Sequence, residues 1–249
     1  MNTRFPTRIH RLELGTRSID LLAPVNPDVL LDDPEVRKRY HADNYMPYWP
    51  IIWPSGLMLA AKVLSDQTSP PALPPKPPAE PGAKECSLNR KSKTENRKCI
   101  DLGCGLGITG IAAALRGWHV TFTDYDHEAV QFAAHNAARN GVPEHLIRPQ
   151  FMDWRNPLSE KFPWVLASDV LYERRLHPLL LHAVSCLLAA DGIAWISDPQ
   201  RTSAEDFPLA AVEAGFKVQT ENLSPPPSPS FSGGVQNGHL YILTRPCVK

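Results

Sequence analysis

The fold of this chain is decided by the stretch Cys99-Ile100-Asp101-Leu102-Gly103-Cys104-Gly105-Leu106-Gly107-Ile108-Thr109-Gly110. An apolar run that predicts a strand carries an acid and is followed by alternating glycines. Glycine adopts a positive φ without a Cβ clash, so the chain can turn sharply off the strand and bring backbone N–H groups close to a ligand. The stretch therefore predicts a nucleotide-binding loop and, with it, an enzyme.

Two cofactor classes compete for this loop. Residues 105–110 match the dinucleotide pattern G-x-G-x-x-G, which is weak evidence when it stands alone. In that pattern the first glycine follows the strand directly, whereas here residues 101–104 give the longer pattern acid-x-Gly-x-Gly-x-Gly. The longer pattern resembles the first motif of the seven-strand S-adenosylmethionine-dependent methyltransferases.

Acids follow the next two predicted strands. Residues 118–123 predict a strand, and Asp124 follows it directly, about 20 residues beyond the glycines. An acid at this place can chelate ribose hydroxyls in either enzyme class. A third strand closes at Asp153-Trp154, which the resemblance assigns to the adenine end of the cofactor. Asp101 as a helix cap and Asp124 as the start of a turn remain the alternatives. The resemblance implies S-adenosyl-L-methionine as cofactor, bound by Trp53, Asp101, Gly103, Gly105, Gly107, Asp124, Asp153, Trp154 and Ser168.

Apolar strands alternate with helical patterns from residue 99 onward, which predicts an α/β fold with a doubly wound, mostly parallel, seven-stranded Rossmann-like sheet. Ligands of such sheets bind outside the carboxyl ends of the strands. We therefore expect Asp101, Asp124, Asp153, Asp169 and Asp198 to converge on one cleft. The predicted strands are 99–103, 118–123, 146–151, 163–168, 192–197, 216–222 and 238–245, and the predicted helices are 107–117, 127–140, 174–190 and 203–215.

Three regions divide the chain. Residues 1–65 predict an N-terminal hairpin, with strands at 9–14 and 18–22, and a lead-in helix that opens near Ser55; the aromatic-rich run 45–61 is expected to be buried or to face the cofactor. Residues 66–98 are rich in proline and then in basic residues, and they predict a disordered insertion, as does the shorter segment 224–230. Residues 99–249 form the predicted catalytic core.

A narrower resemblance rests on Asp169-x-x-Tyr172, Asp153-Trp154 and the aromatic lead-in, which look like the nicotinamide N-methyltransferase-like protein-lysine methyltransferases. Residues 53–56 (WPSG) and 198–201 (DPQR) resemble, within that group, the electron-transfer flavoprotein β-subunit lysine methyltransferase type. The resemblance implies that Asp169 orients the acceptor amine and that Tyr172 walls its channel. A helix cap and a core aromatic are the alternatives for this pair. Asp198 and Arg201 are candidates to bind substrate or to form a local ion pair, and Trp53 is a candidate to cover the cofactor or to fill the core.

The resemblance implies N-methylation of a protein lysine side chain. Methylation of a small amine or pyridine nitrogen is a second hypothesis. A third is a non-catalytic binding module that keeps the fold and uses its proline-rich segments for partners. Specificity in such folds resides in loops around a shared site, so the sequence leaves the acceptor open.

Composition disfavours several function classes. The 26 basic and 26 acidic residues balance, which disfavours a nucleic-acid partner. The five cysteines contain no C-x-x-C pair, and His177 and His182 lie five residues apart, so we expect reduced thiols, no metal site and a cytoplasmic protein. The N-terminus does not resemble a secretory signal, and no apolar run reaches the ~20 residues of a membrane span. The oligomeric state is left open.

Overall fold

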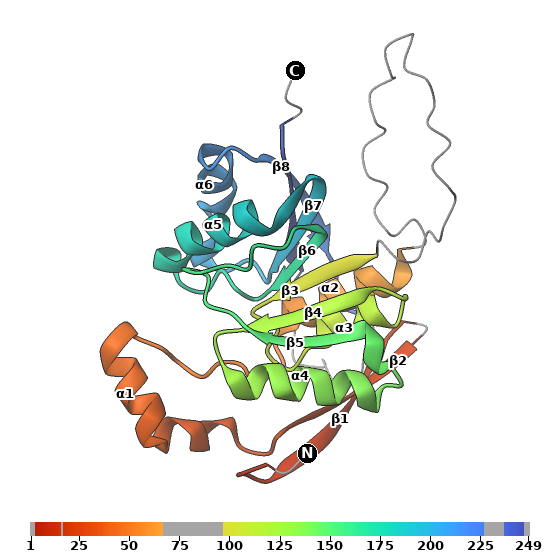
Figure 1. Cartoon of the computed structure of the whole chain (residues 1–249), viewed down its shortest axis with the longest axis vertical. Coiled ribbons are helices and arrows are strands. Elements are labelled where there is room, and N and C mark those ends of the chain that lie inside the picture. Colours follow the sequence, from red (N-terminus) through yellow and green to blue (C-terminus); the bar gives the residue numbers. More distant parts are fainter. Residues whose placement is uncertain (1–2, 16, 67–96, 227–236, 247–249) are drawn as a thin grey trace.

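The computed structural model describes residues 3–15, 17–66, 97–226 and 237–246 (Figure 1). The predicted insertion lies outside the described residues except at its ends, where Lys98 already belongs to the first core strand. The segment 224–230 is likewise described only as far as residue 226.

One seven-stranded sheet forms the core, in the order β5-β4-β3-β6-β7-β9-β8. Strands β3 to β7 pair in parallel, and β9 pairs antiparallel with both β7 and β8. This topology confirms the predicted doubly wound, mostly parallel sheet. The strands are β3 (Lys98–Leu102), β4 (His119–Asp124), β5 (Ile147–Phe151), β6 (Phe162–Ser168), β7 (Leu188–Asp198), β8 (Lys217–Leu223) and β9 (Gly238–Thr244).

Helices cover both faces of the sheet (Figure 1). Because successive strand residues point to opposite faces, neighbours in β3 enter different cores: Cys99 packs with α2, α3 and α4, while Ile100 packs with α5 and α6. The two layers enclose the sheet and leave its carboxyl edge for a ligand. The helices are α2 (Pro54–Ser65), α3 (Ile108–Ala114), α4 (His127–Arg139), α5 (His177–Leu187) and α6 (Phe207–Glu213).

The predicted N-terminal hairpin is confirmed. Strands β1 (Thr7–Leu14) and β2 (Arg17–Pro24) pair antiparallel, and β2 lies against α4. An arm follows, made of the 3-10 helix η1 (Pro27–Asp32) and α1 (Pro34–Asp43). The arm extends away from the sheet before the chain returns over its carboxyl edge into α2 (Figure 1).

Two predicted helices are wrong at their ends. The expected helix 174–190 is a 3-10 turn, η3 (Arg174–Leu176), followed by α5, and residues 188–190 belong to β7. Leu188 pairs with Phe162 through a register shift, so β7 begins before the alternating pattern is visible in the sequence. The expected helix 203–215 is split into η4 (Thr202–Ala204) and α6. Pro208 lies in the first turn of α6, where its missing N–H costs no helical hydrogen bond.

Candidate functional site

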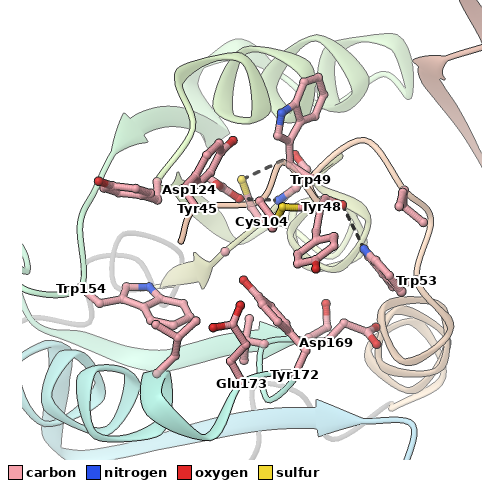
Figure 2. Close-up of a pocket in the computed structure, with 18 of the residues that line it drawn as sticks. Tyr45, Tyr48, Trp49, Trp53, Cys104, Asp124, Trp154, Asp169, Tyr172 and Glu173 are labelled. Atoms are coloured by element: carbon pink, nitrogen blue, oxygen red, sulfur yellow. Dashed lines mark hydrogen bonds between the residues drawn. The ribbon is translucent and has the colours of Figure 1, made fainter. Parts of the chain in front are cut away.

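A pocket opens at the carboxyl ends of β3, β4 and β6. Its floor contains the glycine loop after β3, and the lead-in segment 43–53 forms its roof. Figure 2 shows aromatic side chains from the lead-in facing carboxylates that follow the core strands. Segments far apart in the sequence therefore meet at the edge where the sheet topology places a ligand.

The glycine loop fits a closely approaching ligand. Gly103 and Gly105 have φ of 65° and 51°, and both line the pocket. A Cβ on Gly105 would lie 3.1 Å from the carbonyl oxygen of Trp49, so the lead-in backbone closes directly over the loop. A side chain at this position would fill space needed by the roof or by a ligand.

Asp124 is the last residue of β4 and presents its carboxylate to the pocket. Its Oδ2 accepts a hydrogen bond of 3.0 Å from the Gly105 backbone N–H, and its Oδ1 accepts one of 3.0 Å from the Asp126 N–H. Burial raises the pKa of Asp124 to about 6. Each oxygen keeps an acceptor position, as required to chelate two hydroxyl groups.

Asp101 and Gly107, which the resemblance assigns to cofactor binding, do not line the pocket. Asp101 lies inside β3 with 1% exposure, and its Oδ2 accepts a 2.9 Å hydrogen bond from the Gly110 N–H in the first turn of α3. Burial raises its pKa to about 7. A Cβ on Gly107 would lie 2.8 Å from the Cβ of Ala133, so this glycine permits α3 and α4 to pack. Both residues shape the loop from beneath, and the helix-cap alternative describes Asp101 better.

The third predicted strand end contributes Asp153 and Trp154 to the pocket wall. Asp153 accepts hydrogen bonds from the Arg155 backbone N–H at 2.9 Å and from its Nε at 2.8 Å, which orients the loop. Ser168, at the end of β6, also lines the pocket, and its Oγ lies 3.2 Å from Thr109 Oγ1. These three predicted residues share one cavity with Asp124.

The roof is aromatic, and only Trp53 of its members was singled out from the sequence. The Trp53 indole N–H donates to the Tyr48 carbonyl at 3.0 Å, and Tyr48 meets Tyr172 edge to face with ring centroids 5.2 Å apart (Figure 2). Trp49 and Tyr45 complete the roof. The aromatic-rich run predicted such a role for the segment, but irregular backbone gives no periodicity from which the inward-facing residues can be read.

Hydrogen bonds tie the roof to the rest of the pocket. The Tyr125 hydroxyl donates to Asp43 Oδ2 at 2.8 Å, and Arg175 donates to the backbone carbonyls of Asp43 at 3.1 Å and Asn44 at 3.4 Å. Tyr45 donates its hydroxyl proton to Asp126. No sequence motif indicated these contacts, because each joins the N-terminal arm to a strand end more than 80 residues away.

Asp169 has a left-handed backbone (φ 58°) and a buried carboxylate. Its Oδ2 accepts from the Ser55 hydroxyl at 2.6 Å and from the Gly56 N–H at 2.9 Å. Its Oδ1 accepts from Arg201 at 2.8 Å. Burial raises its pKa, against the lowering effect of these partners. The carboxylate anchors the first turn of α2 and retains one free acceptor position, on Oδ1.

Asp198 and Arg201 form the local ion pair that was the alternative to substrate binding. Asp198 is fully buried behind the pocket and accepts from the Arg201 backbone N–H at 2.6 Å and from its guanidinium at 2.8 Å. The guanidinium also lies over the Trp53 ring, 5.4 Å from its centroid. The expected convergence of five acids is therefore wrong for Asp101 and Asp198 and holds for Asp124, Asp153 and Asp169.

Tyr172 faces the acidic side of the pocket. Burial and the negative charges of Asp124 and Glu173 raise the pKa of its hydroxyl, which has no hydrogen-bond partner among the described residues. The wall carries five carboxylates and two guanidinium groups, an excess of acid that suits a cationic ligand. The carboxylates belong to Asp43, Asp124, Asp153, Asp169 and Glu173, and the guanidinium groups belong to Arg155 and Arg175.

Within the described ranges, no group of three or more His, Cys, Asp or Glu side chains is arranged to hold a metal ion. In the same part of the chain no helix has the length and apolar character needed to cross a membrane.

Comparison with known proteins gives concordant matches. A family model described as lysine methyltransferase matches residues 49–213. EEF1A lysine methyltransferase 3 of Xenopus tropicalis is 31% identical over 119 residues, covering 45% of this chain and 51% of that protein. Protein N-lysine methyltransferase METTL21A of the same organism is 31% identical over 129 residues, covering 50% of this chain and 59% of its own length.

A solved structure has the same core fold. It is a proposed methyltransferase from Thermoplasma acidophilum, with a TM-score of 0.50 and 14% identity, and the match covers 61% of this chain and 69% of that one. At this identity the likeness concerns the fold alone. The sequence matches span about half of each curated relative, so they concern the core and the roof of the pocket and not the whole length of those proteins.

Proposed function

The chain belongs to the lysine methyltransferase family, and on that premise we propose that it transfers a methyl group from S-adenosylmethionine to the side-chain amine of a lysine in a protein. The observation that carries this proposal is the pairing of Asp124 with the Gly103–Gly105 loop under an aromatic roof. The acceptor side of the same pocket is acidic and aromatic, which suits an alkylammonium group before it loses its proton.

The residues present fit the proposed cofactor. Asp124 has acceptor positions free for ribose hydroxyls, and the positive-φ glycines leave room for the cofactor beside the loop. Trp154 supplies an aromatic wall for adenine, next to Asp153. When bound, S-adenosylmethionine supplies a methyl group made electrophilic by its sulfonium. The excess of carboxylates in the wall favours a cationic cofactor over its neutral product.

The acceptor amine has to arrive without its extra proton. A lysine amine has a reference pKa near 10.4, so it enters mostly protonated, and burial among the rings of Tyr48, Tyr172 and Trp53 lowers that pKa. The Tyr172 hydroxyl is placed to orient the neutral nitrogen by donating to or accepting from it. In the transfer the nitrogen lone pair forms the new C–N bond, the C–S bond breaks, and the amine proton passes to water.

In this proposal Asp169 does not act as a general base. Three hydrogen bonds engage its carboxylate, and they fix the start of α2 and, through Arg201, the ring of Trp53. Its remaining Oδ1 acceptor position can orient the amine, but a carboxylate close to the amine favours the charged form and opposes deprotonation. Asp169 therefore positions the acceptor side of the pocket, and water takes the proton.

The test uses methyl-labelled S-adenosylmethionine with lysate from the source organism. We expect label in a discrete protein band and, after acid hydrolysis, in methylated lysine. Asp124→Ala is the control, because it removes the proposed ribose ligand. Label only in small molecules would transfer the proposal to a small-molecule N-methyltransferase, and label in methylhistidine would keep the chemistry but change the acceptor. No transfer to any fraction would support a non-catalytic module.

We also propose a reducing, cytoplasmic setting. Cys99 and Cys104 are buried free thiols whose pKa values burial raises, and Cys186 is also free. Cys86 and Cys247 lie outside the described residues. Fractionation of source cells tests this proposal, and recovery of the protein with the extracytoplasmic fraction would contradict it.

A further inference from the structure

Two asparagines on α4 bind the backbone of the N-terminal hairpin. Asn140, the residue that caps α4, accepts from the Asp20 N–H at 2.9 Å and donates to the Asp20 carbonyl at 2.9 Å. Asn136 accepts from the Leu22 N–H at 2.7 Å and donates to the Leu22 carbonyl at 3.1 Å. The asparagines are one helical turn apart, and their partners are two residues apart on one edge of β2. The two side-chain amides thus pair with backbone N–H and C=O groups of β2, as a neighbouring strand would.

Each asparagine makes a third hydrogen bond. Asn140 donates within α4 to the Asn136 backbone carbonyl at 2.8 Å, whereas the third bond of Asn136 reaches the cofactor loop. The Asn136 Nδ2 donates to the Leu106 carbonyl at 3.1 Å, between the two glycines at positions 105 and 107. The side chain is fully buried, and Leu106 lines the pocket. One amide therefore bonds both to the N-terminal hairpin and to the loop at the cofactor site.

The same face of α4 supports the loop at a second point. Ala133, three residues before Asn136, lies so close to Gly107 that a Cβ there would come within 2.9 Å of the Ala133 Cα. On its other side the loop is held by the hydrogen bond from Gly105 to Asp124. The turn from residue 105 to 107 is thus fixed between α4 and the end of β4.

We propose that Asn136 is a positioning residue for cofactor binding, which sets the shape of the glycine loop through the Leu106 carbonyl and couples the N-terminal hairpin to that loop. The identity of the cofactor in this proposal rests on the proposed function. Without Asn136 the Leu106 carbonyl loses its partner in a buried setting, where an unsatisfied polar group is costly, so the loop shifts to satisfy it.

Asn136→Ala and Asn140→Ala form a matched pair, because each removes three hydrogen bonds, two of them to β2, and only the first removes the bond to Leu106. We expect both variants to melt at lower temperature than wild type. By calorimetry, Asn136→Ala should weaken S-adenosylmethionine binding about tenfold, as loss of one buried hydrogen bond implies, while Asn140→Ala stays within about twofold of wild type.

Hydrogen exchange gives a second measurement that needs no cofactor. Deuterium uptake in residues 104–108 should be faster in Asn136→Ala than in wild type and unchanged in Asn140→Ala. If the alanine variants do not fold, Asn136→Leu and Asn140→Leu repeat the comparison with side chains of similar volume. These leucines fill the same space and donate no hydrogen bond.

Equal weakening of binding by both variants, or Asn136→Ala with wild-type affinity and wild-type exchange, would overturn the inference. Failure of the wild-type chain to bind S-adenosylmethionine would overturn the proposed function and the cofactor role of Asn136 together. The exchange data separate the two failures, since a loop loosened only in Asn136→Ala still supports the coupling between hairpin and loop.

Discussion

The guanidinium of Arg201 lies 2.8 Å from Oδ1 of Asp169 and bridges it to a second buried carboxylate, that of Asp198. Asp169 follows β6, Asp198 ends β7, and Ser55 and Gly56 bring the start of α2 to the same point. This cluster fixes one wall of the pocket and the Trp53 ring above it. The charges of this cluster mainly stabilise the structure of the site, and supplying a catalytic base is not their main role.

Arg201→Ala should lower the free energy of unfolding by about 3 kcal/mol, because it leaves two buried carboxylates without their cation. Arg174→Ala is the control: its ion pair with Asp206 is exposed on both sides, and its loss should cost less than about 1 kcal/mol. Urea unfolding of both variants measures the difference. Equal losses would show that the Arg201 cluster is no more than a surface ion pair.

Tyr172→Phe should lower kcat about tenfold while leaving S-adenosylmethionine affinity unchanged, since the ring still packs on Tyr48 and only the orienting hydroxyl is lost. Tyr241→Phe, a tyrosine of β9 away from the pocket, should keep wild-type kinetics. Steady-state assays on the acceptor identified by labelling supply the measurement. A wild-type kcat in Tyr172→Phe would contradict the proposed role of the hydroxyl in orienting the amine.

Stability should fall as pH rises from about 4 to 7. Burial raises the pKa of Asp124 to about 6 and that of Asp101 to about 7, above the ordinary value near 3.9 in the unfolded chain. Between these values the folded chain keeps protons that the unfolded chain has lost, so each unit of pH costs the fold about 1.4 kcal/mol per group. The penalty is absent below pH 4 and complete above the folded pKa values.

Asp101→Asn tests this sign, because it keeps an acceptor for the Gly110 N–H and removes the charge. The stability of the variant relative to wild type should increase with pH between about 4 and 7, in urea titrations at several pH values. A difference that is constant with pH would place the Asp101 pKa near its ordinary value.

Binding of S-adenosylmethionine near pH 6 should release protons, because a cation in the pocket lowers the pKa of Asp124. S-adenosylhomocysteine, which lacks the sulfonium charge, should release fewer. Calorimetry in two buffers of different ionisation enthalpy counts the protons. Asp124→Asn should abolish the difference between the two ligands, and equal release by both ligands in wild type would contradict the electrostatic argument.

The sequence predicts the sheet well, because buried parallel strands give apolar runs that end in acids, and the glycines mark the loop after β3. It does not distinguish the acids: Asp101 lies within β3 and points into packed helix, whereas Asp124 ends β4 and reaches the pocket. Asp101 is the second-last residue of β3 and Asp124 is the last residue of β4, so the two acids differ by one residue in their position relative to the strand end. Local propensity gave no sign of the register shift between Phe162 and Trp164 that lets β7 begin at Leu188.

The parts that sequence reasoning missed are contacts between distant segments. Asn136 matches the helical pattern of α4, and nothing local shows that it bonds Leu22 and Leu106. Arg201 was a candidate for substrate, yet Asp169 and Trp53 come to it from segments 32 and 148 residues away. Such contacts follow from tertiary packing, which no pattern in one sequence encodes directly.

The most direct test of the account is the affinity of S-adenosylmethionine for wild type and for Asp124→Ala, measured by calorimetry with Asp206→Ala as an exposed control. We predict one molecule bound per wild-type chain, affinity at least about a hundredfold weaker in Asp124→Ala, and no change in Asp206→Ala. Absence of binding to the wild-type chain, or equal binding by Asp124→Ala, would contradict the assignment of this pocket as the cofactor site.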